Sequence, residues 1–172
     1  MSAPTIRLPR LLEADPLSPR ILQLLVDHAQ PLRQGSEIMV ASVKLGEGLV
    51  RALRSANTSG MAARGLESAE EQLELEERGL ALADKKQGVT RGGRISRLLI
   101  LSGDGSDRFY RRVENLLRRH TPRVLAVRLK ADAATLGGIL YGPGRMVKLL
   151  MIEHKAAVST VLLAMAMQDE GA

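Results

Sequence analysis

Short apolar runs of strand length alternate with longer amphipathic stretches between residues 94 and 166. Residues 98–101 and Val124–Leu129 are such runs, and apolar residues recur at helical spacing between Asp107 and His120. Strands and helices that alternate over short connections pack as a sheet covered by helices. The sequence therefore predicts an α/β fold, a three-layer α/β/α sandwich with a mainly parallel sheet of about four strands.

The remaining chain divides into an arm and a single domain. Residues 1–17 carry three prolines and no regular apolar pattern, so we expect an N-terminal arm followed by one domain over residues 18–172. The secondary structure of residues 37–45 is ambiguous, because their apolar pattern suits either a buried strand or a helix capped by Ser36. We favour a strand, followed by a helix over about 46–55.

A helical insertion is expected at about 57–92. Residues 57–86 hold 7 Asp and Glu against 4 Lys and Arg. Leu66, Leu73 and Leu80 lie one heptad apart within a Glu-rich helix over 66–86. Ala69 and Glu76 occupy the intermediate heptad positions, which makes the apolar stripe thin and favours a docked or partly exposed helix over a coiled coil. A homodimer through the three leucines is a possible alternative.

Composition excludes several classes of protein. The chain has no cysteine, which excludes disulfides and thiolate metal sites. It has one Phe, two Tyr and no Trp, which argues against modules that stack bases on exposed rings. No apolar run has the length of a membrane span, and the first residues lack a signal-peptide core. We expect a cytoplasmic protein with no membrane partner.

Positive charge is concentrated in the second half. Residues 87–155 contain 14 Lys and Arg against 5 Asp and Glu. Five of these cations lie on one predicted helix, where only Asp107 and Glu114 offset them: Arg108, Arg111, Arg112, Arg118 and Arg119. Such a stripe is suited to phosphates and predicts RNA as a partner. The alternative is the ordinary exposed face of an amphipathic helix.

Three other groups of residues are candidate sites. Residues 102–107 (SGDGSD) could hold a phosphate, but a turn with Ser106 as helix cap is the simpler interpretation. The glycine-rich residues 137–145 could bring Tyr141 and Arg145 to a ligand. His28, His120 and His154 lack ligand spacing, and residues 153–155 (EHK) form only a weak catalytic cluster at a strand end. We predict no catalytic residue, no cofactor and no metal.

Residues 46–54 (GEGLVRALR), Arg97–Leu101 (RLLIL) and 136–147 (LGGILYGPGRMV) together resemble the kink-turn-binding ribosomal-protein family. The resemblance implies a small α/β/α sandwich that recognises RNA with the N-terminus of one helix and neighbouring loops. That fold also recruits RNA in some ribose methyltransferases and occurs in release factors. It implies RNA contacts at Gly46, Glu47 and Arg145. The family has Asn-Glu after its glycine, whereas Gly46 is followed by Glu47 and Gly48.

The leading hypothesis is therefore a non-catalytic protein that binds structured RNA. Two alternatives remain open. One is a protein-interaction or oligomerisation module that uses the spaced leucines and the apolar last helix. The other is a small nucleotide-binding enzyme that uses residues 102–107.

Overall fold

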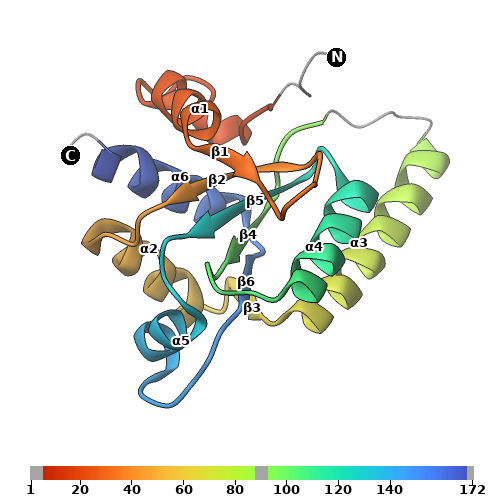
Figure 1. Ribbon diagram of the computed structural model, residues 1–172. Coiled ribbons are helices and arrows are strands. Elements are labelled where there is room, and N and C mark those ends of the chain that lie inside the picture. The colour runs from red at the N-terminus through yellow and green to blue at the C-terminus, as the bar shows by residue number, and fades with distance from the viewer. Residues whose placement is uncertain (1–5, 88–92, 170–172) are drawn as a thin grey trace.

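The computed structural model describes residues 6–87 and 93–169. In this part of the chain six strands form one sheet, in the order β1-β2-β5-β4-β6-β3, and six α-helices cover it (Figure 1). The elements are a 3₁₀ turn Arg10–Leu12, α1 Ser18–Asp27, β1 Ala29–Pro31, β2 Met39–Val43, α2 Glu47–Thr58, β3 Ala62–Arg64, α3 Leu66–Gln87, β4 Arg97–Leu101, α4 Asp107–His120, β5 Val124–Leu129, α5 Ala133–Tyr141, β6 Leu149–Ile152 and α6 Lys155–Asp169. The predicted α/β class is confirmed, and residues 37–45 do contain a strand.

The sheet is mixed, and the prediction of about four mainly parallel strands was wrong. Strand β5 runs parallel to β2 and to β4, whereas the pairs β1–β2, β4–β6 and β3–β6 are antiparallel. Two of the six strands have only three residues, too few to show an alternating pattern in the sequence.

The direction of β6 follows from the position of α5. A Cβ built on Gly137 of α5 would lie 2.1 Å from the carbonyl oxygen of Arg145, so only glycine lets the two segments pack together. The amide of Val147 also donates to the carbonyl of Ala133 at 3.0 Å. The chain therefore turns back beside the start of α5, enters β6 at the edge where β5 ended, and runs antiparallel to β4.

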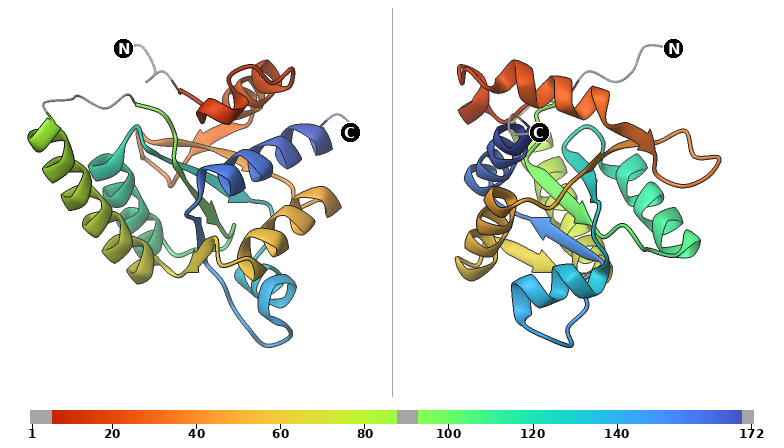
Figure 2. Two further views of the ribbon diagram at one scale, coloured as in Figure 1. Left: turned by 180° about the vertical axis from the view of Figure 1, so that it is seen from behind. Right: turned by 60° about the vertical axis from the view of Figure 1, so that its left-hand side comes forward.

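Each face of the sheet has its own apolar core. Helices α1, α2, α5 and α6 cover one face, and Leu53, Val158 and Ile100 are buried there. Helices α3 and α4 cover the other, where Leu73, Val113 and Leu99 are buried. Figure 2 shows α2 and α6 on one side of the sheet and α4 on the other. The alternation of Leu99 and Ile100 between the two cores is the period-2 pattern of a strand buried on both faces.

The segment predicted as an insertion builds part of this architecture. Its described residues supply the end of α2, the edge strand β3 paired with β6, and α3, which lies beside α4 (Figure 1). Leu66 and Leu73 are buried in the second core, and Leu80 is half-buried. Two of the three leucines proposed for a homodimer are thus already covered within the chain, which leaves that dimer without structural support.

Candidate nucleic-acid interface

The predicted arginine stripe lies on α4, and most of it has carboxylate partners. Arg112 donates to Glu70, and Arg119 donates to Glu74 at 2.5 Å; both glutamates belong to α3. Within α4, Arg111 pairs with Asp107 at 2.7 Å and Arg118 with Glu114 at 2.8 Å. Among the described residues, Arg108 is the stripe member for which no ion pair is formed. The acidic helix α3 therefore offsets much of the charge that the sequence placed on α4.

The same helix neutralises arginines at the ends of two strands. Glu76 accepts hydrogen bonds from Arg97 at 3.0 Å and from Arg123 at 2.9 Å, and Arg123 also reaches Glu77 at 3.1 Å. Burial opposes the charged form of Glu76, but hydrogen bonds from Gln72, Arg123 and Arg97 outweigh it and lower the pKa of this carboxyl. The acidic face of α3 is a structural partner of these arginines, which makes this layer a poor candidate for an anion site.

Glu114 ties the β1–β2 hairpin to α4. Its side chain is 8% exposed and accepts from Arg33 at 3.0 Å, Ser36 at 3.1 Å and Arg118 at 2.8 Å. Burial alone would raise the pKa of Glu114, yet the bonds from Arg118 and Ser36 and the charge of Arg33 lower it. Of the predicted contacts, Arg118 is therefore committed to this network.

At the end of the sheet opposite Arg97 and Arg123, strands β2, β5 and β4 stop and lead into α2, α5 and α4. This end is here called the carboxyl edge. Two of these helices begin with side-chain caps. At the start of α4, the Ser106 side chain accepts from the amide of Phe109 at 3.1 Å. At the start of α5, the Asp132 side chain accepts from the amide of Thr135 at 2.7 Å, and the Asp104 side chain accepts from the amide of Ala133 at 2.9 Å. One first-turn amide of α4 and two of α5 thus already have side-chain acceptors.

The loop over residues 102–107 is closed in the same way. The hydroxyl of Tyr110 accepts from the amide of Gly105 at 3.0 Å and donates to the carbonyl of Ser102 at 2.7 Å. A Cβ on Gly105 would lie 2.6 Å from the ring of Phe109, so the loop is also tightly packed. A turn with Ser106 as cap is confirmed, and little backbone is left for the phosphate of the nucleotide-enzyme alternative.

Helix α2 begins without a side-chain cap. Gly46 is its N-cap residue, and no side chain within residues 6–87 and 93–169 accepts from the first-turn amides. The amide of Gly46 itself donates to Gln168 at 3.1 Å, while a Cβ on Gly48 would meet no atom within 4 Å. Exposed Lys44 precedes this turn, and exposed Lys130 follows the neighbouring strand β5. Open amides, a positive helix end and two lysines gather here, which suits an anion.

The turn after α5 adds a second basic group to this edge. Gly142 and Gly144 have φ of 101° and 81°, which turn the chain sharply and leave Arg145 exposed. Tyr141 donates to Asn57 at 3.0 Å, and the Arg64 guanidinium lies 4.8 Å from the centre of its ring. The structure thus brings Arg145 to the same edge as Gly46 and Glu47, although it is distant from them in the sequence.

Sequence reasoning missed Lys44, Lys130, Lys148 and Arg64 at this edge. Lys44 and Lys130 each directly follow the last residue of a parallel strand, and that position could have revealed them. Lys148 precedes β6, and Arg64 ends β3 beside it. All four are exposed.

His120 and the cluster at residues 153–155 lie away from this edge, whereas His28 lies beside the ends of β2 and β5. Because β6 runs antiparallel to β4, residues 153–155 follow it at the opposite edge, where they do not form the site expected for a parallel strand. His120 is buried, with its Nδ1 3.5 Å from Glu77. Over the described ranges, no three metal-ligating side chains gather in one place. Within those ranges, none of the helices combines the length and apolar composition needed to cross a membrane.

No family model matches this sequence, and no curated protein matches it. Among solved structures, the chain is similar to the 15.5 kD RNA binding protein of Giardia lamblia, with 16% identity and a TM-score of 0.46 over 74% of this chain and 92% of that one. It is also similar to a protein of unknown function from Bacillus halodurans, with 15% identity and a TM-score of 0.45 over 71% of this chain and 99% of that one.

Proposed function

We propose that the protein binds structured RNA, without catalysis, through the carboxyl edge of its sheet. The observation that carries this proposal is the uncapped start of α2, flanked by Lys44 and Lys130, next to two helix starts that are capped. Backbone amides there would hold one phosphate, and the lysines would hold its neighbours. Arg145, Lys148 and Arg64 extend the charged edge toward β3.

A folded RNA suits this edge better than a single strand. The chain has two Tyr, and Tyr141 already contacts Arg64 on its ring, so a row of stacking rings is lacking. The resemblance to the kink-turn-binding family implies RNA contacts at Gly46, Glu47 and Arg145, and these three residues lie at this edge, which supports the proposal. A bent RNA would present several phosphates at once to the α2 start and to the turn after α5.

The arginines of α4 have a smaller role in this proposal. Arg111, Arg112, Arg118 and Arg119 can approach phosphates only by sharing or leaving carboxylate partners. Arg108 is exposed in the first turn of α4, which begins at the carboxyl edge, and it is the α4 residue that we include in the interface.

The test compares two triple variants that remove the same charge. Lys44→Ala, Lys130→Ala and Arg145→Ala should weaken binding of a kink-turn RNA by about ten- to a hundredfold and lower the salt slope by roughly two to three. Arg111→Ala, Arg118→Ala and Arg119→Ala on α4 should change both much less. Fluorescence anisotropy at low and high salt measures the affinity.

Each part of the proposal can fail separately. If the native protein has no affinity for kink-turn or duplex RNA at low salt, RNA binding is wrong. If the α4 triple variant loses more affinity than the edge variant, RNA binding stands and the interface is α4.

A further inference from the structure

Helix α3 presents carboxylates to the arginines of the neighbouring helix α4. The two helices lie side by side (Figure 2). Glu70 of α3 accepts from Arg112, and one helical turn further along Glu74 accepts from Arg119 at 2.5 Å. Both arginines therefore have their charge compensated by a different helix, at the surface where the two helices meet.

These two ion pairs are not what holds α3 in place. Leu66, Ala69 and Leu73 of α3 are buried in the second core, and their burial docks the helix. The Glu70 and Glu74 side chains are 37% and 38% exposed, and ion pairs open to water contribute little to stability. What the two glutamates add to this surface is therefore negative charge more than stability.

This charge opposes nucleic acid. Helix α4 carries five arginines against Asp107 and Glu114, and such a row would attract the phosphates of any nucleic acid, whatever its shape. Residues 66–77 of α3 contribute six glutamates and no lysine or arginine. A phosphate that approaches Arg112 or Arg119 must displace a carboxylate and meets a like-charged helix. Contact between like charges suppresses binding of unwanted partners.

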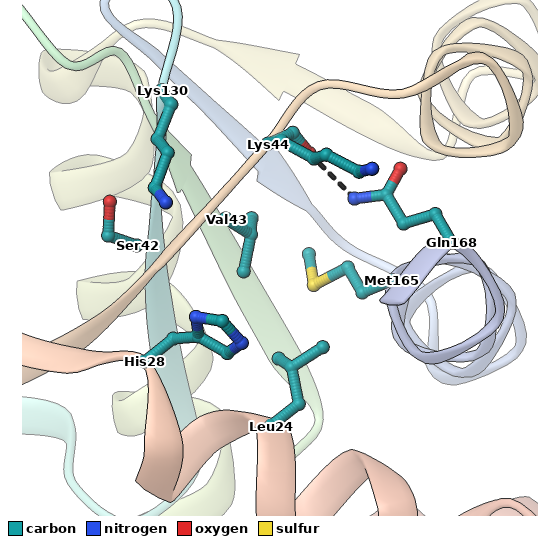
Figure 3. Close-up of a pocket in the computed structure, with 8 residues that line it drawn as sticks. All are labelled: Leu24, His28, Ser42, Val43, Lys44, Lys130, Met165 and Gln168. Atoms are coloured by element: carbon teal, nitrogen blue, oxygen red, sulfur yellow. Dashed lines mark hydrogen bonds between the residues drawn. The ribbon is translucent and has the colours of Figure 1, made fainter. Parts of the chain in front are cut away.

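The lysines of the carboxyl edge have no such counter-charge. Lys44 and Lys130 are exposed, and neither forms an ion pair with any residue within 6–87 and 93–169. The pocket beside them is lined by eight residues, none of which is acidic (Figure 3). Positive charge is thus accessible at one surface of the molecule and compensated at the other.

We infer that Glu70 and Glu74 are specificity-determining residues, which occupy arginines of α4 so that nucleic acid is excluded from that helix and directed to the carboxyl edge. The inference rests on the proposed function, because it explains how a protein with two basic surfaces restricts RNA to one of them. Its partner of opposite effect is an unselected linear polyanion, for which duplex DNA is the probe.

Removal of the two carboxylates tests this inference. Glu70→Gln with Glu74→Gln leaves side chains that can still accept hydrogen bonds but removes the competing charge. This double variant should bind a short duplex DNA about tenfold more tightly than the native protein at low salt. The slope of log K against log salt should steepen by about 1.8, because Arg112 and Arg119 each gain a phosphate. Fluorescence anisotropy over a range of salt concentrations measures both.

Two controls separate this effect from a general change of charge. Glu67→Gln with Glu71→Gln removes the same charge from exposed positions of α3 that have no arginine partner in the described part of the chain, and should change the affinity less than about threefold. Adding Arg112→Ala and Arg119→Ala to the first double variant should abolish its gain, because those are the guanidinium groups released. None of these side chains is buried, and circular dichroism checks that each variant folds.

The inference is overturned if the first double variant binds duplex DNA no more tightly than the native protein, if the control gains as much, or if the gain survives loss of the two arginines. Duplex DNA contains no kink-turn, so this comparison is independent of the RNA test. If the native protein fails to bind kink-turn RNA, the proposed function is wrong, and the duplex DNA comparison still decides whether α3 blocks α4.

Discussion

At the scale of single residues, Glu76 shows how an acidic side chain holds this fold together. It lies on α3, accepts from two arginines at the sheet, and is only 16% exposed. Its lowered pKa means that the folded state favours the ionised carboxylate. The associated stabilisation is therefore present above the ordinary carboxyl value and is lost as the pH falls through the lowered pKa.

Glu76→Gln should reduce the free energy of unfolding at neutral pH by about 2 kcal/mol, because Arg97 and Arg123 lose a charged acceptor. The difference from the native protein should shrink in acid, because Glu76 takes up a proton as the pH falls through its lowered pKa. Urea unfolding at pH 7 and at about pH 3 measures both values. Glu71→Gln, on an exposed position of the same helix, is the control and should have little effect at either pH. A penalty for Glu76→Gln that is the same at both pH values contradicts this account.

At the scale of elements, α5 depends on two adjacent glycines that have opposite roles. Gly137 faces the backbone of Arg145, whereas a Cβ on Gly138 would meet no atom within 4 Å. Gly137→Ala should lower the free energy of unfolding by about 2 kcal/mol or more, because the clash is with backbone. Gly138→Ala should raise it by roughly 0.5–1 kcal/mol through helix propensity. Thermal unfolding compares the two, and equal effects of the two variants would refute the close approach.

Elements with a strong local signal were predicted from the sequence. Asp107–His120 and Val124–Leu129 occur with the predicted bounds, because an amphipathic period with the Ser106 cap and a continuous apolar run are local features. Strands β1 and β3 were missed, since three residues show no period. The direction of β6 was missed because it depends on the approach of Arg145 to Gly137, which is non-local.

In the candidate site, too, local features could be predicted from the sequence and non-local ones could not. Gly46, Glu47 and Arg145 could be named from a resemblance and a glycine-rich turn. The pairing of Glu70 and Glu74 with arginines of α4 could not be predicted, because it depends on how two helices pack. Charge counts along the sequence overestimate the free positive charge of α4 for this reason.

At the scale of the whole molecule, the sheet separates two cores that share no helix. Ile21 of α1 is buried in one and Leu116 of α4 in the other. Ile21→Val should cost about 1 kcal/mol and Leu116→Ala about 2–3 kcal/mol. Because the sites lie on opposite faces, the double variant should lose the sum within about 0.5 kcal/mol. Urea unfolding of the four proteins measures the coupling, and a markedly larger coupling would mean that the sheet transmits packing changes between its faces.

The short strand β3 also covers one edge of the sheet. It covers β6, whose four residues are fully buried and apolar, and the amide of Gly65 extends the pairing to Leu149. Without β3, that strand would be an open, uncharged edge of the kind on which fibrils grow. With it, the outermost strand has three residues and ends in the charged Arg64. The cover of this sheet edge thus depends on a segment that sequence patterns identify only as a loop.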